Sequence, residues 1–134
     1  MRVLCRRQEV AWTVVVVEPV LSWLHELRHT DRRTLVLISA AIDALAEEGP
    51  ALGRPLVDTV KGSRIANLKE LRPGSAGRSE VRLLFVFDPV RQIVLLVGGD
   101  KAGGWRAWYG AAVPRAEAAY AEHLERLREK GGER

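Results

Sequence analysis

The sequence predicts an α+β protein in which helices pack against a mainly antiparallel sheet of about four strands. Short runs of β-branched and apolar residues, bounded by glycine and proline, indicate the strands. Stretches with apolar residues three or four positions apart indicate helices before and after them. With 134 residues, 47% of them hydrophobic, the chain can bury one core. We therefore expect a single domain over 1–134, with frayed ends at 1–8 and 131–134.

The N-terminal part predicts a strand followed by a helical hairpin. Residues 9–17 read EVAWTVVVV, a β-branched run typical of a strand. Apolar residues at helical spacing then predict a helix over 18–29, and a second stripe predicts another helix that ends at Glu48. Either Thr30 or Asp31 can cap this second helix. The short connection makes the helices antiparallel neighbours.

The rest of the chain predicts a meander and a closing helix. Residues 51–61 have glycine and proline but little periodicity, so we interpret them as a loop. Strands are expected at 66–72, 80–87 and 92–98, and their short connections make them antiparallel. A last helix is expected over 114–130.

Positive charge is concentrated in the middle of the chain. The stretch 61–82 holds six basic residues against Glu70 and Glu80, a local charge of +4, which equals the net charge of the whole protein. A localised positive surface on a small domain is typical of a polyanion partner, most often RNA or DNA. The six residues are Lys61, Arg64, Lys69, Arg72, Arg78 and Arg82.

The composition argues against a membrane or disulfide-rich protein. No run approaches the roughly 18 apolar residues of a membrane span, and the run 14–17 is too short for a signal peptide. The single cysteine, Cys5, excludes an internal disulfide framework and a thiolate metal cluster. We therefore expect a cytoplasmic protein.

One short motif suggests zinc. Residues 25–29 read HELRH, and on a helix H-E-x-x-H places two imidazoles on one face, with a glutamate able to activate metal-bound water. Against a zinc peptidase, His29 falls at the predicted helix end and Leu27 belongs to the apolar stripe. A solvated histidine pair is the simpler interpretation, so no metal site is assigned.

The segment 98–104 is rich in glycine and precedes three aromatic residues. It lacks the Gly-Lys-Ser/Thr ending of a nucleotide-binding P-loop, so we expect no nucleotide or other cofactor. The glycines make either a simple turn or an anion site together with Lys101. Trp105, Trp108 and Tyr109 then follow beside cations, an arrangement that stacks RNA bases when it is not core packing.

Several motifs together resemble a known family. These are GPALGRP at 49–55, LKELR at 68–72, EVRLLF at 80–85, and the apolar strand at 93–97 followed by Lys101. In this order, they resemble the phage-derived HigB branch of the RelE/ParE toxin superfamily of type II toxin–antitoxin systems. The likeness covers roughly residues 10–128.

The resemblance implies a RelE-like fold and an activity. Members of this superfamily are endoribonucleases (mRNA interferases) that cleave messenger RNA, usually on the ribosome. They are silenced in a complex with a cognate antitoxin, often a helix-turn-helix protein, so an oligomer with that antitoxin is expected. The ParE-like alternative is a toxin that inhibits gyrase by binding it, without RNA chemistry.

The resemblance also assigns a catalytic set: Arg72, Arg82, Lys101 and Glu70. Attack by a 2′-hydroxyl group needs a proton acceptor, stabilisation of the phosphorane and a proton for the leaving 5′-oxygen. The arginines would hold the phosphate, Lys101 would join them or act as an acid or base, and Glu70 would be the base or would orient an arginine.

Other residues are expected to bind the substrate. Strand alternation places Lys69 on the face opposite Glu70, which weakens it as a catalytic candidate. Trp105 is the expected stacking residue and Tyr109 the more polar one. The steering cations, which would contact the RNA backbone, are Lys61, Arg64 and Arg78.

Overall fold

The computed structural model describes residues 11–74, 77 and 79–132. Its strands are β1 (Thr13–Val16), β2 (Val57–Thr59), β3 (Lys69–Leu71), β4 (Val81–Phe87) and β5 (Gln92–Asp100). Its helices are α2 (Val20–Thr30), α3 (Arg32–Glu48), the short 3-10 helix η1 (Gly49–Ala51) and α4 (Trp105–Gly132). The fold is α+β, as predicted. The expected frayed ends, 1–8 and 133–134, lie outside the described residues, whereas 131 and 132 are still helical.

The strands form one five-stranded sheet in the order β1-β5-β4-β3-β2. β1 pairs with β5 in parallel, and all the other neighbours are antiparallel. The β4–β5 and β3–β4 connections are short, which is why these strands pair antiparallel. β1 can run parallel to β5 because the α2–α3 hairpin separates it from the rest of the sheet in sequence.

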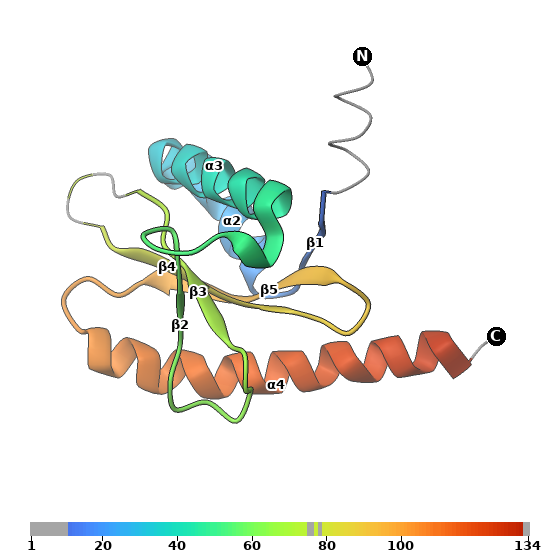
Figure 1. Cartoon of the computed structure of the whole chain (residues 1–134). Helices are drawn as coiled ribbons and strands as arrows, with labels where there is room; N and C mark the ends of the chain where they lie inside the picture. Colours follow the sequence, from blue (N-terminus) through green and yellow to red (C-terminus); the bar gives the residue numbers. More distant parts are fainter. Residues whose placement is uncertain (1–10, 75–76, 78, 133–134) are drawn as a thin grey trace, which may run out of the picture.

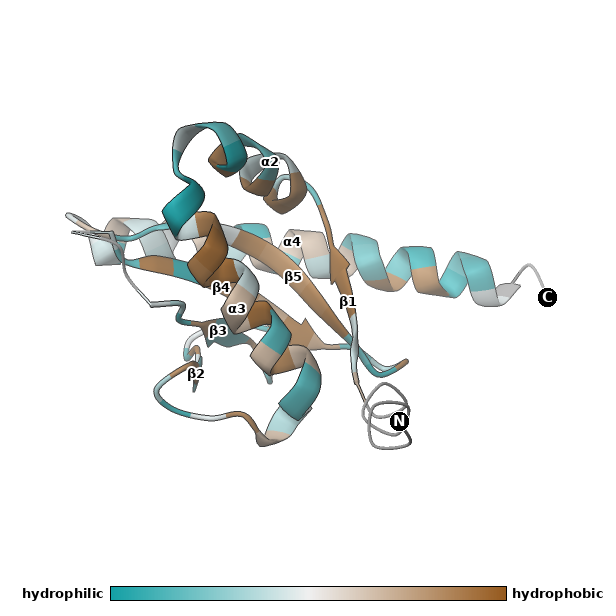
Figure 2. Cartoon of the chain, turned by 90° about the horizontal axis from the view of Figure 1, so that it is seen from above, coloured by the Kyte–Doolittle hydropathy of each residue, from teal (hydrophilic) through white to brown (hydrophobic). Residues whose placement is uncertain are grey.

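Helices cover both faces of the sheet. The α2–α3 hairpin packs on one face and the long α4 on the other (Figure 1). Apolar residues line the strands and the sides of the helices that face them, whereas the outer sides of the helices are hydrophilic (Figure 2). The predicted cap is confirmed, because Asp31 Oδ1 accepts a hydrogen bond from the Thr34 N–H at 3.2 Å.

The central strand β4 contributes to a core on each face. Val81, Leu83 and Phe85 are buried with the α2–α3 hairpin. Leu84 and Val86 are buried with α4. The predicted alternation of β4 is therefore confirmed, and it turns Arg82 away from the aromatic core toward α4.

The interpretation of 51–61 as a loop was wrong in part. Val57–Thr59 is the edge strand β2, and it pairs with β3, with Asp58 opposite Glu70. A three-residue strand is too short to show an alternating pattern, and its hydrogen bonds come from a partner distant in sequence. The sheet therefore has one strand more than the four expected.

The predicted end of the last strand, at 98, and the predicted start of the last helix, at 114, were also wrong. β5 continues through Gly98 and Gly99 to Asp100, and α4 begins at Trp105 with Pro114 inside it. The glycines stay in the strand because indoles pack against them. A Cβ atom on Gly98 would lie 2.5 Å from Trp23, and one on Gly99 would lie 2.7 Å from Trp108 Nε1.

Candidate active site

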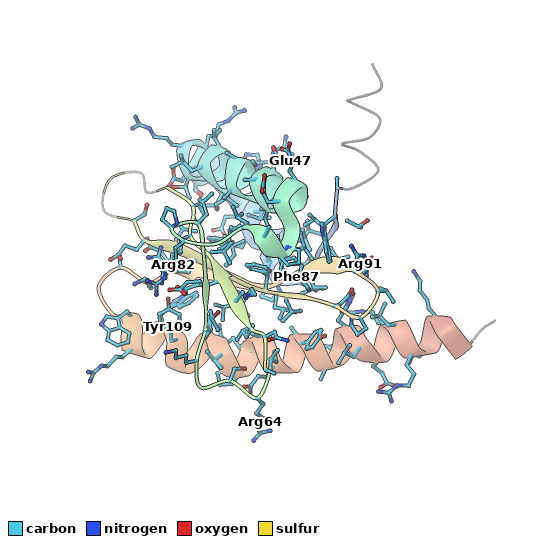
Figure 3. All side chains as sticks on the ribbon, viewed as in Figure 1. Glu47, Arg64, Arg82, Phe87, Arg91 and Tyr109 are labelled. Carbon is cyan, nitrogen blue, oxygen red and sulfur yellow. The ribbon has the colours of Figure 1, made fainter. Side chains whose placement is uncertain are left out.

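The candidate site lies between the sheet and the first turns of α4. In Figure 3, Arg82 and Tyr109 lie at the same end of the molecule, where β4 begins and α4 starts. The antiparallel register puts Arg82 opposite Gly99 and Glu70 opposite Leu84, on the α4 side of the sheet. Residues from β3, β4, β5 and α4 therefore converge here.

Glu70 is a buried carboxylate in this site. Glu70 is only 3% exposed, because alternation along β3 turns its side chain toward α4. One oxygen, Oε1, accepts a short hydrogen bond from the Tyr109 hydroxyl group. The other, Oε2, accepts one from Arg72 Nε at 2.7 Å. The charge of Glu70 is thus paired, as a buried charge requires.

Arg72 lies between two carboxylates. Besides Glu70, it contacts Asp58 Oδ2 on β2, at 3.1 Å from Nη2. Partial burial lowers the pKa of its guanidinium group, but the hydrogen bond and charge of Glu70 and the charge of Asp58 raise that pKa overall. Arg72 therefore stays charged, and its charge is largely neutralised within the protein.

Arg82 is bound differently. Its Nη1 donates to the Val81 carbonyl oxygen at 2.8 Å. Its Nε is buried and, among the described residues, has no hydrogen-bond partner. An unpaired buried donor on a charged group is costly to leave unsatisfied, and because this atom is closed off from solvent, a phosphate oxygen could reach it only after the side chain moves.

Lys101 follows β5 and faces the same site. Its Nζ lies 3.5 Å from Glu80 Oε1 and 5.9 Å from the centre of the Tyr109 ring. The Lys101 side chain is 18% exposed, whereas that of Glu80 is 51% exposed. An ion pair with an exposed partner at this distance is weak, so the lysine can exchange Glu80 for another anion.

Tyr109 contacts Glu70 through its hydroxyl group and lies near Lys101 through its ring. Burial raises the pKa of its hydroxyl group to about 12, and the hydrogen bond to Glu70 and the negative charge of Glu70 raise it as well. The positive charges of Arg82 and Arg72 lower this pKa, but by less. The hydroxyl group is therefore protonated at neutral pH and donates to Glu70. The ring centre of Trp108 lies 5.0 Å from that of Tyr109, and the ring centre of Trp105 lies 6.4 Å from it.

The structure thus brings the catalytic candidates Glu70, Arg72, Arg82 and Lys101 together with Tyr109. Their catalytic roles stay predictions. Asp58 was missed, because the segment around it was interpreted as a loop. The available signal was the acidic residue within a Val-Asp-Thr run, which is typical of a strand with one polar face.

The substrate-binding candidates are more scattered. Trp105 is 56% exposed beside the site. Lys61 lines a surface hollow that Trp105, Glu70 and Tyr109 also line. Lys69 lies on the face opposite Glu70, as alternation predicted. Arg64 points away from the body of the molecule (Figure 3). Arg78 lies outside the described residues.

The zinc motif lies elsewhere. His25 and His29 are exposed on α2, which is separated from the candidate site by the sheet. In the described part of the chain, three or more histidine, cysteine, aspartate or glutamate side chains nowhere gather as metal ligands would. Among the same residues, no helix has the length and hydropathy to cross a bilayer.

Fold and site together define a class of protein: a small RelE-like α+β protein with cations around a buried glutamate at one end of its sheet. Residues 23–121 match the model of the family described as phage derived protein Gp49-like (DUF891). The chain belongs to this family, which confirms the predicted resemblance to phage-derived HigB proteins.

Two relatives from Mycobacterium tuberculosis (strain ATCC 25618 / H37Rv) are similar to the chain. The protein named Putative toxin HigB2 is 57% identical over 115 residues, which are 86% of this chain and 55% of that protein. The protein named Putative toxin HigB3 is 48% identical over 104 residues, which are 78% of this chain and 86% of that protein. The chain therefore spans about half the length of the first relative. No solved structure matches the chain significantly.

Proposed function

We propose that the protein is the toxin of a type II toxin–antitoxin system and that it acts as an endoribonuclease on messenger RNA. The observation that carries the proposal is the convergence of Arg82 and Lys101 on the Glu70–Tyr109 pair, in a chain whose relatives are named as toxins. This arrangement offers both anion binding and a proton acceptor.

The cations divide into two groups. Arg82 Nη1 donates to a neutral carbonyl oxygen and Lys101 has a weak, exposed partner, so we assign these two side chains to the scissile phosphate. Arg72 is held by Glu70 and Asp58, so it mainly orients Glu70.

The reaction follows from these positions. Glu70 takes the proton of a ribose 2′-hydroxyl group, whose oxygen attacks the adjacent phosphorus. Arg82 stabilises the charge of the phosphorane, and the Lys101 ammonium group gives a proton to the departing 5′-oxygen. The products are a 2′,3′-cyclic phosphate and a free 5′-hydroxyl group, and the proton that Glu70 takes is matched by the one that Lys101 gives.

A toxin of this kind needs further partners. A cognate antitoxin would silence it in the cytoplasm, and messenger RNA on the ribosome would be its substrate. The helix-turn-helix type of antitoxin is the one that the family resemblance suggests. A reading frame for a small helix-turn-helix protein beside the gene, and co-purification of its product with this chain, would support this part of the proposal.

The test compares Arg82→Ala and Lys101→Ala with the wild-type protein. Both variants should abolish growth inhibition and messenger RNA cleavage while remaining folded by circular dichroism. Arg128→Ala is the matched control, because this arginine is exposed on α4, where its neighbour Glu125 lies 3.2 Å away. Full toxicity of both site variants contradicts the proposal. Blocked DNA supercoiling with intact transcripts would indicate the gyrase-inhibiting alternative.

A further inference from the structure

The base of the proposed reaction is closed off from solvent. Glu70 is almost fully buried, and each of its oxygen atoms already accepts a hydrogen bond, one from Tyr109 and one from Arg72. Arg82 Nε is buried as well. A general base must come within roughly 2.6–3.2 Å of the hydroxyl group that it deprotonates. RNA therefore reaches this site only after a neighbouring part of the chain moves.

The part of the chain that covers Glu70 and is easiest to move is the beginning of α4. β3, which carries Glu70, is hydrogen-bonded to strands on both sides and is thus held in the sheet. By contrast, Trp108 and Tyr109 are the only residues from 105 to 111 that are not exposed. Segments with few buried contacts are the first to open in a native protein. The first turns of α4 are therefore the part that can uncover the site.

This part of α4 is bounded by residues that weaken a helix. Gly103 precedes it, with a φ of 85°. Pro114 lies inside α4 and has no N–H group, so the Gly110 carbonyl oxygen lacks a donor four residues further on. Gly110 is itself an exposed residue with a low helix propensity. Sharp kinks in helices occur mostly at proline, so the pair Gly110 and Pro114 is a suitable hinge.

The rest of α4 is firmly attached to the body of the protein. Ala116 is fully buried against the sheet. Glu117 Oε2 accepts a hydrogen bond from Ser63 Oγ at 2.9 Å, and His123 Nε2 lies 2.7 Å from Asp88 Oδ2. The first turns can therefore move while the longer part of the helix stays in place.

We propose that residues 105–113 form a gate over the candidate active site, which the hydrogen bond from Tyr109 to Glu70 holds closed and which opens about Gly110 and Pro114. The proposal rests on the proposed function, because RNA is the molecule that the open gate admits to Glu70 and Arg82. The fraction of open molecules then limits the apparent affinity for RNA, since only these molecules are competent to bind it.

Amide hydrogen exchange, followed by nuclear magnetic resonance, measures the gate without RNA. The amides of 108–113 should share one opening free energy, because the gate opens as a unit. This free energy should be lower than that of the amides of 116–124, with a step at Pro114. Simple fraying of the helix end would instead give protection that rises gradually along α4.

Two substitutions should shift the opening equilibrium in opposite directions. Gly110→Ala stabilises the closed helix, since a Cβ atom at this position meets nothing within 4 Å. Exchange of 108–113 should slow by about 4- to 5-fold, which is the helix-propensity difference between the two residues expressed as a ratio. Tyr109→Phe removes the hydrogen bond to Glu70. Exchange should then accelerate by about 10- to 150-fold, the range for loss of a hydrogen bond to a charged group.

Gly131→Ala is the matched control for Gly110→Ala. It is the same change near the other end of α4, and a Cβ atom there also meets nothing within 4 Å. Exchange of 108–113 should be the same in this variant as in the wild type. A general effect of alanine on the whole helix would slow exchange in both variants and would overturn the hinge at Gly110.

The kinetics of RNA cleavage connect the gate to the substrate. Because RNA binds only open molecules, Gly110→Ala should lower kcat/KM by the same factor of about 4 to 5 as it slows exchange. At saturating RNA every molecule is open, so kcat should stay unchanged. Damage to the catalytic groups would lower kcat instead, which separates a change in the gate from a change in the chemistry.

The outcomes distinguish the two proposals. A gradual rise of protection along α4, equal exchange in the wild type and both gate variants, or an unchanged kcat/KM in Gly110→Ala overturns the gate. RNA cleavage together with any of these results leaves the proposed function standing without the gate. Slower exchange in Gly110→Ala and faster exchange in Tyr109→Phe, in a protein that cleaves no RNA, support the opening of 105–113 and contradict the endoribonuclease.

Discussion

The Tyr109 hydroxyl group on α4 donates a hydrogen bond to Glu70 on β3, across the interface between helix and sheet. The two residues are 39 positions apart in the sequence. This contact joins a buried carboxylate to an aromatic ring that also lies near Lys101. It is therefore both a packing contact of α4 and a part of the candidate active site.

Replacement of Glu70 by glutamine should separate binding from chemistry. Glu70→Gln keeps the size of the side chain and removes the proton acceptor, so kcat for RNA cleavage should fall by about 10²- to 10⁴-fold. RNA affinity should stay the same or increase, because a negative charge is lost. Single-turnover cleavage and fluorescence anisotropy measure the two quantities. Unchanged kcat would show that Glu70 only orients Arg72.

Tyr109 should make the protein sensitive to alkali. Its pKa is raised from 10.0 to about 12 in the folded protein, so the unfolded chain loses this proton at lower pH than the folded one. The stabilisation that results is complete below about pH 10 and is lost as pH rises toward about 12.

Denaturant unfolding at several pH values measures this effect against Tyr109→Phe. The wild type should lose more stability than the variant between pH 10 and pH 12. The phenylalanine ring preserves the contacts with Trp105 and Trp108, which makes it the matched control for the hydroxyl group. Parallel stability curves for the two proteins over this interval would contradict the prediction.

Gly99→Ala should disturb the site through packing. The added methyl group would lie 2.7 Å from Trp108 Nε1, so the indole and the start of α4 must shift. We expect a loss of stability of about 1–3 kcal/mol, typical of overpacking. Gly104→Ala, where a Cβ atom meets nothing within 4 Å, is the control. Thermal unfolding measures both, and equal melting temperatures would contradict the expected clash.

A second buried pair stabilises the other end of α4. Asp88 accepts hydrogen bonds from the Gln92 N–H at 2.8 Å and from Gln92 Nε2 at 2.9 Å, and it lies 2.7 Å from His123 Nε2. Burial raises the pKa of Asp88, but the bonds from His123 and Gln92 lower it overall, below its usual 3.8. The resulting stability is present above about pH 3.8 and is lost as pH falls through the lower folded value.

Asp88→Asn should therefore cost stability at neutral pH and less in acid. An amide has one acceptor oxygen, so at least one of the buried donors loses its partner, which costs about 1–3 kcal/mol. Urea unfolding at pH 7 and at successively lower pH measures the difference between variant and wild type. A difference that does not narrow in acid would contradict the lowered pKa. Glu122→Gln, an exposed carboxylate on the same helix, serves as the control.

The predictions from sequence were strongest where the signal is local. Apolar periodicity predicted α2, α3, β4 and β5, and alternation along β4 correctly turned Arg82 toward the α4 side. The family resemblance selected Glu70, Arg72, Arg82 and Lys101, and the structure places all four in one site. Each of these inferences needs only neighbouring residues or the order of motifs.

Tertiary structure decided what depends on contacts between distant segments. β2 exists because β3 supplies its hydrogen bonds, and through it Asp58 reaches Arg72. α4 begins at Trp105 rather than Pro114, because Trp108 and Tyr109 gain burial against the sheet where Gly99 leaves room for an indole. The sequence by itself determined the fold class and the family. Packing alone decided which cation is neutralised, which donor is left unpaired, and where a hollow stays open beside them.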